Sequence, residues 1–388
     1  MKLNTIKSFK TWRDKRVLLR LDLNVVIHKN KVHPKDAWRL ERALPTIKFL
    51  LKNQAKVIIV AHLGRPNAKV VPDLSLKPVV KYLSQSLQQD IKLWAGNLEE
   101  YVEQSKKLKA GQLVMLENIR FHAREQKNCR KLAKKLANLA DIYVNDAFSN
   151  MHRDKDTSMM TITKFLPSYA GLLVEDEIKH LSAILASKKG LGVVFGGAKV
   201  STKIGFLHKI SQQAQAVFLG GILANTVLAS RGFDMGALKV ASSELKIAKQ
   251  LSSQKIHLPL DVVVAKNMTE QSSATCDISQ VPANMLAFDI GPKTAKQYLA
   301  ELTKCKLIVW NGPLGYFENK YLSKNSVSFA KALSKMKVKI IVGGGETVAM
   351  LNELNLLKKF TFVSTGGGAL MAFLDGKKLP VLEALMKK

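Results

Sequence analysis

Cysteine, aromatic residues and acidic residues are all scarce in this chain of 388 residues. Its three cysteines, Cys129, Cys276 and Cys305, are far apart and form no C-x-x-C pair. An odd number of cysteines at such spacing argues against a disulfide framework or a zinc site and is typical of a reducing compartment. We therefore expect a cytoplasmic protein.

Long hydrophobic runs are also absent from the sequence. No apolar run approaches the ~20 residues that span a bilayer, and the opening MKLNTIKSFKTWRDKRV lacks the apolar core of a signal peptide. We expect no membrane partner. Hydrophobic residues still make up 47% of the chain, which is ordinary for a globular protein. A single core stops growing near ~250–300 residues, so this length predicts two or three domains.

The shortage of acidic residues leaves a large positive charge: 61 Lys and Arg stand against 30 Asp and Glu, a formal +31. Nucleic-acid binding is one interpretation, because cations that neutralise phosphates release counterions. Such a footprint should be clustered and interleaved with aromatic residues, whereas these lysines are spread along the chain and aromatic residues are 7%. We expect no nucleic-acid partner, and keep a basic nucleic-acid-binding protein as the alternative.

What the sequence does have is a regular alternation of short β-branched runs and segments with helical apolar spacing, typical of βαβ units and a parallel sheet. In the first half the strand-like runs end in polar or basic loops and lie at 16–24, 55–66, 111–122 and 140–153, with helical stretches at 37–53 and 125–140. In the second half nearly every run ends in glycine, and the runs lie at 192–199, 216–226, 258–265, 285–294, 307–318, 339–350 and 362–370. We predict an α/β fold of two doubly wound, Rossmann-like parallel-sheet domains, with the boundary near Pro167 and an amphipathic hinge helix over 170–186.

Five glycine-rich tips in the second half indicate a nucleotide site, because glycine exposes backbone N–H groups to a phosphate. Any one tip alone fits a tight turn equally well. The stretch GLGVVFGGAKVSTKIGF, 190–206, is not a G-x-x-x-x-G-K-[ST] loop. If a helix begins near Ala198, Lys199 and Lys203 stack on one face at i, i+4 and can hold a polyphosphate. A solvated lysine face is the alternative.

Basic side chains gather at the strand ends of the first half. Arginine binds carboxylates and phosphates through two parallel hydrogen bonds, so arginines at several tips favour a small, multiply anionic ligand. The residues concerned are Arg20, Arg39, Arg65, Arg120 and Arg153, with His62 and His122. Asp22 and Asn24 could accept hydrogen bonds from a ligand hydroxyl. Each arginine alone could equally form a surface ion pair.

Nine motifs occur in order over nearly the whole chain: LDLN, RLERALPTIKFL, AHLGRP, LENIRFH, VNDAFSNMHR, GGAKVSTK, WNGPLGYFE, GGGETVA and STGGGA. Together they closely resemble the phosphoglycerate kinase family. The resemblance implies reversible phosphoryl transfer between 1,3-bisphosphoglycerate and ADP, giving 3-phosphoglycerate and ATP, as a step of glycolysis. It also implies a Mg²⁺-dependent monomer and direct in-line transfer after hinge closure.

The resemblance further implies a phosphoglycerate-binding domain over 1–168, to which the tail 373–388 returns, and a nucleotide-binding domain over 169–372. The implied substrate residues are Asp22, Asn24, Arg39, His62, Arg65, Arg120 and Arg153. The implied nucleotide residues are Gly197, Ala198, Lys199, Lys203, Gly291, Asn311, Glu318, Gly344, Gly345, Glu346 and Thr347. Within these sets we expect Arg39, Lys199 and Lys203 to be catalytic, Glu318 to meet the ribose and Glu346 to meet the metal.

Four positions depart from the family pattern: Val26 replaces a proline, Thr202 an aspartate, Glu346 the aspartate of G-G-G-D-T, and Ala372 a glutamate. The change at Glu346 matters most, because one extra methylene moves a metal-associated carboxylate. We expect activity to survive all four. A catalytically inactive nucleotide binder is the alternative that rests on Glu346.

Overall fold

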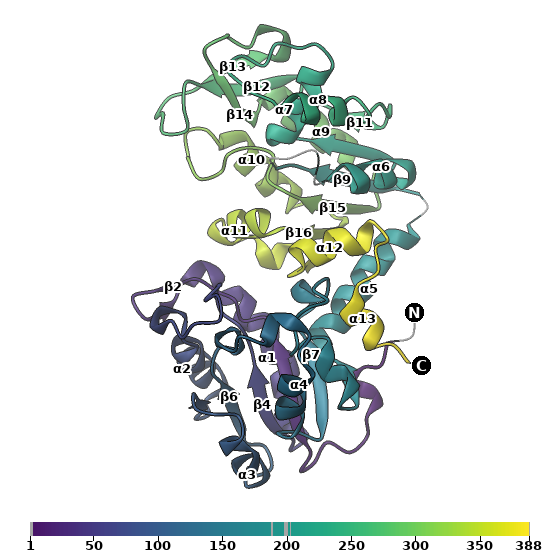
Figure 1. Ribbon diagram of the computed structural model, residues 1–388. Helices are drawn as coiled ribbons and strands as arrows, with labels where there is room; N and C mark the ends of the chain where they lie inside the picture. Colours follow the sequence, from purple (N-terminus) through teal and green to yellow (C-terminus); the bar gives the residue numbers. More distant parts are fainter. Residues whose placement is uncertain (1–2, 188, 198–200, 202, 388) are drawn as a thin grey trace. The chain divides into compact units, whose positions relative to one another are not determined.

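The computed structural model describes residues 3–187, 189–197, 201 and 203–387. The chain divides into two compact units (Figure 1): unit 1 comprises Met1–Lys179 with Lys377–Lys388, and unit 2 comprises His180–Gly376. The division falls within helix α5 (Leu172–Ala186), which confirms the helix predicted over 170–186. The predicted domain boundary at 168/169 lies just before this helix, and the roles assigned to the two domains stay predictions.

Unit 1 contains a six-stranded, all-parallel sheet in the order β5-β6-β4-β1-β7-β8. The strands are β1 (Arg16–Leu21), β4 (Lys56–Val60), β5 (Lys92–Trp94), β6 (Leu113–Leu116), β7 (Ile142–Asp146) and β8 (Ser168–Ala170). Their apolar, β-branched sequences suit strands that are covered on both faces. In the central strand, Arg20 pairs in register with Val60 on one side and Asn145 on the other.

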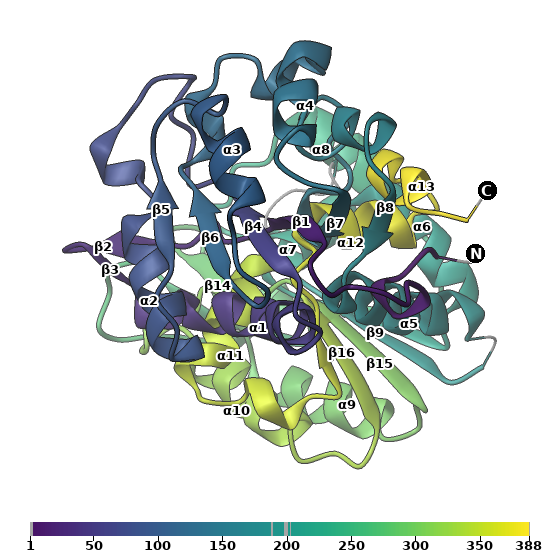
Figure 2. The ribbon, with the colours of Figure 1, turned by 90° about the horizontal axis from the view of Figure 1, so that it is seen from below.

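Helices cover both faces of this sheet (Figure 2). The helices α1 (Ala37–Lys52) and α2 (Lys77–Leu87) pack on the face that carries Leu19 and Ile59. The opposite face, with Leu18 and Ile58, is covered by α3 (Glu100–Lys106) and α4 (Arg130–Ala137). Successive side chains of a strand point to opposite faces of the sheet, so alternate residues of one strand pack into two different hydrophobic cores. A short hairpin of β2 (Ile27–His28) and β3 (Lys31–Val32) follows β1.

Unit 2 contains a second six-stranded parallel sheet, in the order β11-β10-β9-β15-β16-β17, so the predicted α/β class is confirmed. Its strands are β9 (Leu191–Phe195), β10 (Ala216–Leu219), β11 (Ile256–His257), β15 (Leu307–Asn311), β16 (Lys339–Gly343) and β17 (Phe362–Val363). Its helices are α6 (Ile204–Gln213), α7 (Gly221–Ser230), α8 (Ser242–Ala248), α9 (Pro292–Leu302), α10 (Lys324–Leu333), α11 (Gly345–Glu353) and α12 (Gly367–Leu374).

Two of the runs expected in this parallel sheet lie elsewhere, and that expectation is wrong for them. β12 (Asp261–Ala265) pairs antiparallel with both β13 (Ala274–Asp277) and β14 (Leu286–Ile290) in a separate three-stranded sheet. The segment 266–273 between β12 and β13 is too short for the crossover that parallel neighbours need. Moreover, β13 is a short strand of small and polar residues with two of its four residues exposed, so it offers no apolar run from which a strand could be predicted.

The two ends of the chain meet in unit 1. Leu3 and Met386 form an antiparallel bridge, and the amide of Asn4 donates to the carbonyl oxygen of Leu385 at 2.9 Å. The short helix α13 (Pro380–Ala384) precedes this contact, and both termini lie close together in Figure 1. Among the described residues, no helix is both long and apolar enough to cross a membrane.

Candidate functional site

In unit 1 the predicted substrate residues begin with an ion pair at the end of β1. Asp22 is buried and accepts hydrogen bonds from Arg39 of α1, at 2.9 Å, and from the hydroxyl of Ser149. Burial alone would raise the pKa of Asp22, but the charge of Arg39 and the hydrogen bonds from Ser149 and the Asn24 amide outweigh it and lower the pKa to about 2. Asp22 is therefore a fixed anion that orients Arg39.

The loop after β4 joins three more of these residues. Asn24 accepts from the amide of Gly64 at 2.8 Å, and Arg120 donates to the carbonyl oxygen of Gly64 at 2.8 Å. Gly64 has a φ of +61°, which an L side chain adopts only with strain. Arg65 follows it and is exposed to solvent. The backbone N–H and carbonyl oxygen of Gly64 therefore each position a predicted ligand residue.

Arginine outnumbers its carboxylate partners here. The buried Asp156 lies 3.8 Å from Arg120 and 3.9 Å from Arg153. Burial, followed by the like charge of Arg153, lowers the pKa of Arg120 to about 10. His62 is almost completely buried, with its Nδ1 atom 2.9 Å from Arg20. We call Arg39, His62, Arg65, Arg120 and Arg153 the basic cluster. An excess of partly desolvated cations favours binding of an anion.

The structure does not bring His122 into this cluster. His122 instead lines a separate pocket together with Arg124 and Lys135. Burial lowers the pKa of His122.

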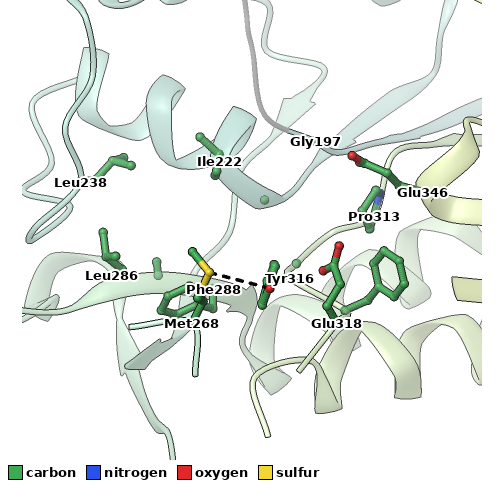
Figure 3. A pocket seen from close by; sticks show the side chains of 14 residues that line it. Gly197, Ile222, Leu238, Met268, Leu286, Phe288, Pro313, Tyr316, Glu318 and Glu346 are labelled. Atoms are coloured by element: carbon green, nitrogen blue, oxygen red, sulfur yellow. Dashed lines mark hydrogen bonds between the residues drawn. The ribbon is translucent and has the colours of Figure 1, made fainter. Parts of the chain in front are cut away.

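Unit 2 holds a pocket of about 340 Å³, drawn in Figure 3. Its lining combines three glycines, a largely apolar wall and two carboxylates. The glycines are Gly197, Gly221 and Gly315; the wall is Ile222, Leu238, Met268, Leu286, Ala287, Phe288, Pro313, Tyr316 and Phe317; the carboxylates are Glu318 and Glu346. Figure 3 shows Glu318 and Glu346 toward one side, with Leu238 and Leu286 on the other. We call this site the glycine-lined pocket.

The side chain of Lys203 contacts the glycine tip that follows β9, and Lys203 itself lies just before a helix. Helix α6 begins at Ile204 with Lys203 as its N-cap residue, at φ −124°, so the helix start expected near Ala198 is wrong. Lys203 donates to the carbonyl oxygen of Gly196 at 2.6 Å. Burial lowers the pKa of Lys203, and the charge of Glu346 opposes that effect. The predicted residues Ala198 and Lys199, and the departure at Thr202, lie outside the described residues.

Glycine is required where two loop tips touch. A Cβ atom on Gly196 would overlap the carbonyl oxygen of Pro313, and Gly312 has a φ of +88° and lies against Gly196. The neighbouring tip also needs glycine, because Gly344 has a φ of +90° at the N-cap of α11. Gly345 follows, with open space where a side chain would stand. The amides of Gly196 and Gly312 already donate, to the carbonyl oxygen of Asn311 and the hydroxyl of Thr347. The N–H groups that a helix leaves for a ligand are therefore those in the first turn of α11.

Three further predicted nucleotide residues are buried and do not line the pocket. Gly291 caps α9, and a Cβ there would overlap the carboxylate of Asp261. Thr347 accepts from the amide of Gly312 at 2.7 Å, so it fixes the loop beside the pocket. Asn311 is buried, and its side-chain Nδ2 finds no hydrogen-bond partner among the residues that the structure describes.

Sequence reasoning missed the apolar wall. Its members come from separate segments: α7, the loops around 238 and 268, β14 and the loop after β15. Ile222 is 47% exposed and Met268 is 56% exposed, unusual values for large apolar side chains at a site edge. Single apolar residues in loops carry no sequence signal, so only the folded arrangement identifies this surface.

Each α/β unit has a parallel sheet; unit 1 carries the basic cluster and unit 2 the glycine-lined pocket. This combination is typical of phosphotransferases that move a phosphoryl group between a nucleotide and a small anion. Comparisons with known proteins narrow this class. The family model described as phosphoglycerate kinase matches residues 6–377. The phosphoglycerate kinase of Finegoldia magna is 40% identical over 99% of both chains, and that of Borrelia garinii subsp. bavariensis is 39% identical over the full length of both.

Solved structures agree with these relatives. The phosphoglycerate kinase of Coxiella burnetii superposes with a TM-score of 0.85 at 35% identity, covering 99% of this chain and 98% of that one. The enzyme from Pyrococcus horikoshii gives a TM-score of 0.87 at 31% identity, with the same coverage. The chain belongs to the phosphoglycerate kinase family. Its activity is phosphoryl transfer between 1,3-bisphosphoglycerate and ADP, a step of glycolysis.

Proposed function

We propose that the basic cluster of unit 1 binds 3-phosphoglycerate or 1,3-bisphosphoglycerate, and that the glycine-lined pocket of unit 2 binds ADP or ATP. The observation that carries the proposal is the lining of that pocket: apolar surface for a base on one side, and glycine tips and carboxylates on the other. Apolar walls with a few placed polar groups are typical of small-molecule sites. The cations of unit 1 supply the complementary charge for a phosphorylated acid.

Within this scheme the protein acts by position and charge. In-line phosphoryl transfer needs no protein nucleophile, only aligned oxygens and neutralised phosphate charge. Lys203, partly desolvated and free to exchange the Gly196 carbonyl for a phosphate oxygen, would accompany the transferred group. Lys199 would steady the nucleotide phosphates. Arg39, aligned by Asp22, would neutralise charge on the acyl phosphate.

We propose Mg²⁺ as the divalent metal that accompanies the nucleotide. Mg²⁺ commonly binds through one or two carboxylates together with substrate phosphates. The described residues contain no cluster of three or more His, Cys, Asp or Glu side chains able to hold a metal by themselves, which suits an ion that arrives on the nucleotide. Glu346, in the first turn of α11 and on the pocket lining, is the side chain fitted to hold it. When bound, the metal would neutralise phosphate charge.

The remaining parts of the proposal concern the whole molecule. Because the two ligands would bind to different units, transfer requires a closed conformation that brings donor and acceptor together and excludes water. We propose that the enzyme works as a monomer in the cytoplasm. The free thiols of Cys129, Cys276 and Cys305 are consistent with a reducing compartment.

A coupled assay tests the proposal. ATP-dependent turnover should require both 3-phosphoglycerate and Mg²⁺, and removing the metal with a chelator should abolish it. Turnover without phosphoglycerate, or none with every component present, would contradict the proposed function. Duplex DNA serves as the comparison ligand, because tight binding that falls steeply with salt would favour the nucleic-acid alternative.

A further inference from the structure

Four buried side chains, one of them His62 of the basic cluster, form a continuous hydrogen-bonded network. Both carboxylate oxygens of Glu125 accept from Ser158, at 2.5 Å from its hydroxyl and 3.0 Å from its amide. The Ser158 hydroxyl accepts from Nε of Arg20 at 3.1 Å, and a terminal nitrogen of Arg20 lies 2.9 Å from Nδ1 of His62. The exposed fractions of all four are 1% or less. We call Glu125, Ser158, Arg20 and His62 the buried network.

The direction of donation at the His62 end of the buried network is fixed by chemistry. Arginine has only donors, so Nδ1 of His62 must be the acceptor and carries no proton. The single hydroxyl hydrogen of Ser158 points to Glu125, which leaves the Ser158 lone pairs for Arg20. A neutral imidazole with a bare Nδ1 carries its proton on Nε2.

That Nε2–H group has no acceptor. Nε2 of His62 is buried and has no hydrogen-bond partner in the part of the chain that the structure describes. A buried donor without an acceptor is costly unless a ligand supplies one. The charged groups that act on the His62 ring are Arg20, Asp22, Arg120 and Arg153, three of them cations. An anionic oxygen is therefore the acceptor that the surroundings favour.

We propose that Arg20, held by Ser158 and Glu125, is a positioning residue that fixes the tautomer of His62, so that a neutral imidazole donates its Nε2–H to an anionic oxygen of phosphoglycerate. The inference rests on the proposed function, which places that ligand in the basic cluster. Arg20 acts through His62, and Glu125 supplies the buried acceptor that keeps Ser158 oriented. Burial and the charge of Arg20 also hold the pKa of His62 well below its ordinary value, which agrees with a neutral ring.

Nitrogen NMR tests the tautomer directly. Long-range proton–nitrogen correlation spectra of the full-length protein with labelled histidine distinguish Nδ1–H, Nε2–H and imidazolium forms, and His62 is assigned by its loss in His62→Gln. We expect the Nε2–H tautomer between about pH 6 and 8. Finding Nδ1–H or imidazolium in the wild-type protein would overturn the proposal. This measurement needs no variant of the buried network to fold.

Enzyme kinetics distinguish a positioning role of the buried network from a purely structural role. Ser158→Ala should raise the KM for 3-phosphoglycerate about tenfold, with kcat and the KM for ATP unchanged, and should disturb the His62 tautomer. Ser158→Thr, which keeps the hydroxyl, should restore both. Tyr143→Phe is the matched control, because Tyr143 is buried beside the network and donates to the Ser158 carbonyl oxygen at 2.7 Å without joining it. Glu125→Gln is the second variant if Ser158→Ala does not fold.

Two outcomes distinguish this inference from the proposed function. If His62→Gln raises the KM for 3-phosphoglycerate but Ser158→Ala changes neither the KM nor the tautomer, the buried network has no positioning role and the inference fails alone. If His62→Gln leaves that KM unchanged, the assignment of phosphoglycerate to the basic cluster fails as well. In the double variant, Ser158→Ala should add nothing to His62→Gln.

Discussion

The Nζ atom of Lys203 lies 2.6 Å from the carbonyl oxygen of Gly196, to which it donates a hydrogen bond. The lysine therefore rests on the backbone at the tip of β9, with its ammonium 5.2 Å from the centre of the Phe195 ring. An ammonium whose hydrogen bond goes to a neutral carbonyl oxygen can transfer to a charged phosphate oxygen with little rearrangement. Lys203 therefore lies where a phosphate bound at the glycine tips could accept its hydrogen bond.

Lys203→Ala should lower kcat about 30- to 1000-fold, because removing one preorganised charge from a transition state costs roughly 2–4 kcal/mol. The matched control is Lys209→Ala, which removes a nearby lysine, within α6, that donates to the carbonyl oxygen of Asp375 at 3.0 Å. The coupled assay measures kcat, and circular dichroism checks folding. Equal losses in both variants would argue against a catalytic role for Lys203.

Gly197→Ala should impair catalysis beyond its effect on stability. Gly197 has a φ of +106°, and an added Cβ would overlap the Lys203 ammonium. Gly232→Ala is the control, because Gly232 has a φ of +94° with open space around the Cβ position. Both should lose about 1–2 kcal/mol of unfolding free energy to backbone strain, measured by denaturant titration. Only Gly197→Ala should lower kcat, and unchanged turnover in it would contradict the contact.

Glu346→Gln should weaken the response to metal. The carboxylate of Glu346 is the proposed protein ligand, so its loss should raise the Mg²⁺ concentration for half-maximal rate about tenfold. Glu318→Gln, on the same pocket, should instead raise the KM for ATP and leave the metal requirement unchanged. Magnesium titrations at fixed ATP measure both effects. If the two variants behave alike, Glu346 has no special relation to the metal.

Ile222→Ser should weaken nucleotide binding. Ile222 lies on the pocket wall at 47% exposure, and a base would bury much of its remaining surface. Losing that burial costs about 1–2 kcal/mol, a rise of roughly five- to thirtyfold in the KM for ATP. The KM for 3-phosphoglycerate should not change. Val70→Ser, at a 77% exposed apolar residue of unit 1, is the control and should change neither KM.

The contribution of Asp289 to stability should fall as the pH rises toward neutrality. Burial raises its pKa from 3.8 to about 7, against opposing hydrogen bonds from Ser326 and its neighbours. Between about pH 4 and 7, the folded state therefore keeps a proton that the unfolded state has already lost. The contribution of Asp289 to the free energy of unfolding should decrease across that window, at a rate approaching about 1.4 kcal/mol for each rise of one in pH.

Denaturant titrations of the wild-type protein and Asp289→Asn at several pH values measure this effect. The wild-type protein should lose stability relative to the variant as the pH rises across that window, since only the wild-type protein has the titrating group. Asp277→Asn is the control, because Asp277 is partly exposed and paired with Lys293. Parallel profiles for the wild-type protein and Asp289→Asn across this window would show that Asp289 is ionised in the folded protein.

Much of the fold could be predicted from the sequence, because β-branched runs and helical spacing dominate in the two parallel sheets. The run at 16–24 is β1, and the polar residues that end it, Asp22 and Asn24, do contact residues from the next predicted elements, Arg39 and Gly64. Parallel strands bring their carboxyl ends to one edge, so residues at several tips can meet there.

The rest depends on tertiary context. The sequence places the first turn of α6 too early, because nothing local marks Lys203 as an N-cap residue. It gives no sign of β13, whose side chains are small or polar and not buried. Gly291 resembles a phosphate-binding glycine, but its lack of a side chain accommodates the carboxylate of Asp261. Such packing cannot be inferred from a motif alone.

The bridge between Leu3 and Met386 has a consequence for how the protein is made. Most of unit 1 precedes unit 2 along the chain, yet the segment Lys377–Lys388 that completes unit 1 is translated only after unit 2. The rest of unit 1 therefore remains incomplete while all of unit 2 emerges from the ribosome. If translation stops before Lys377, unit 1 lacks the segment that pairs with its N-terminal residues.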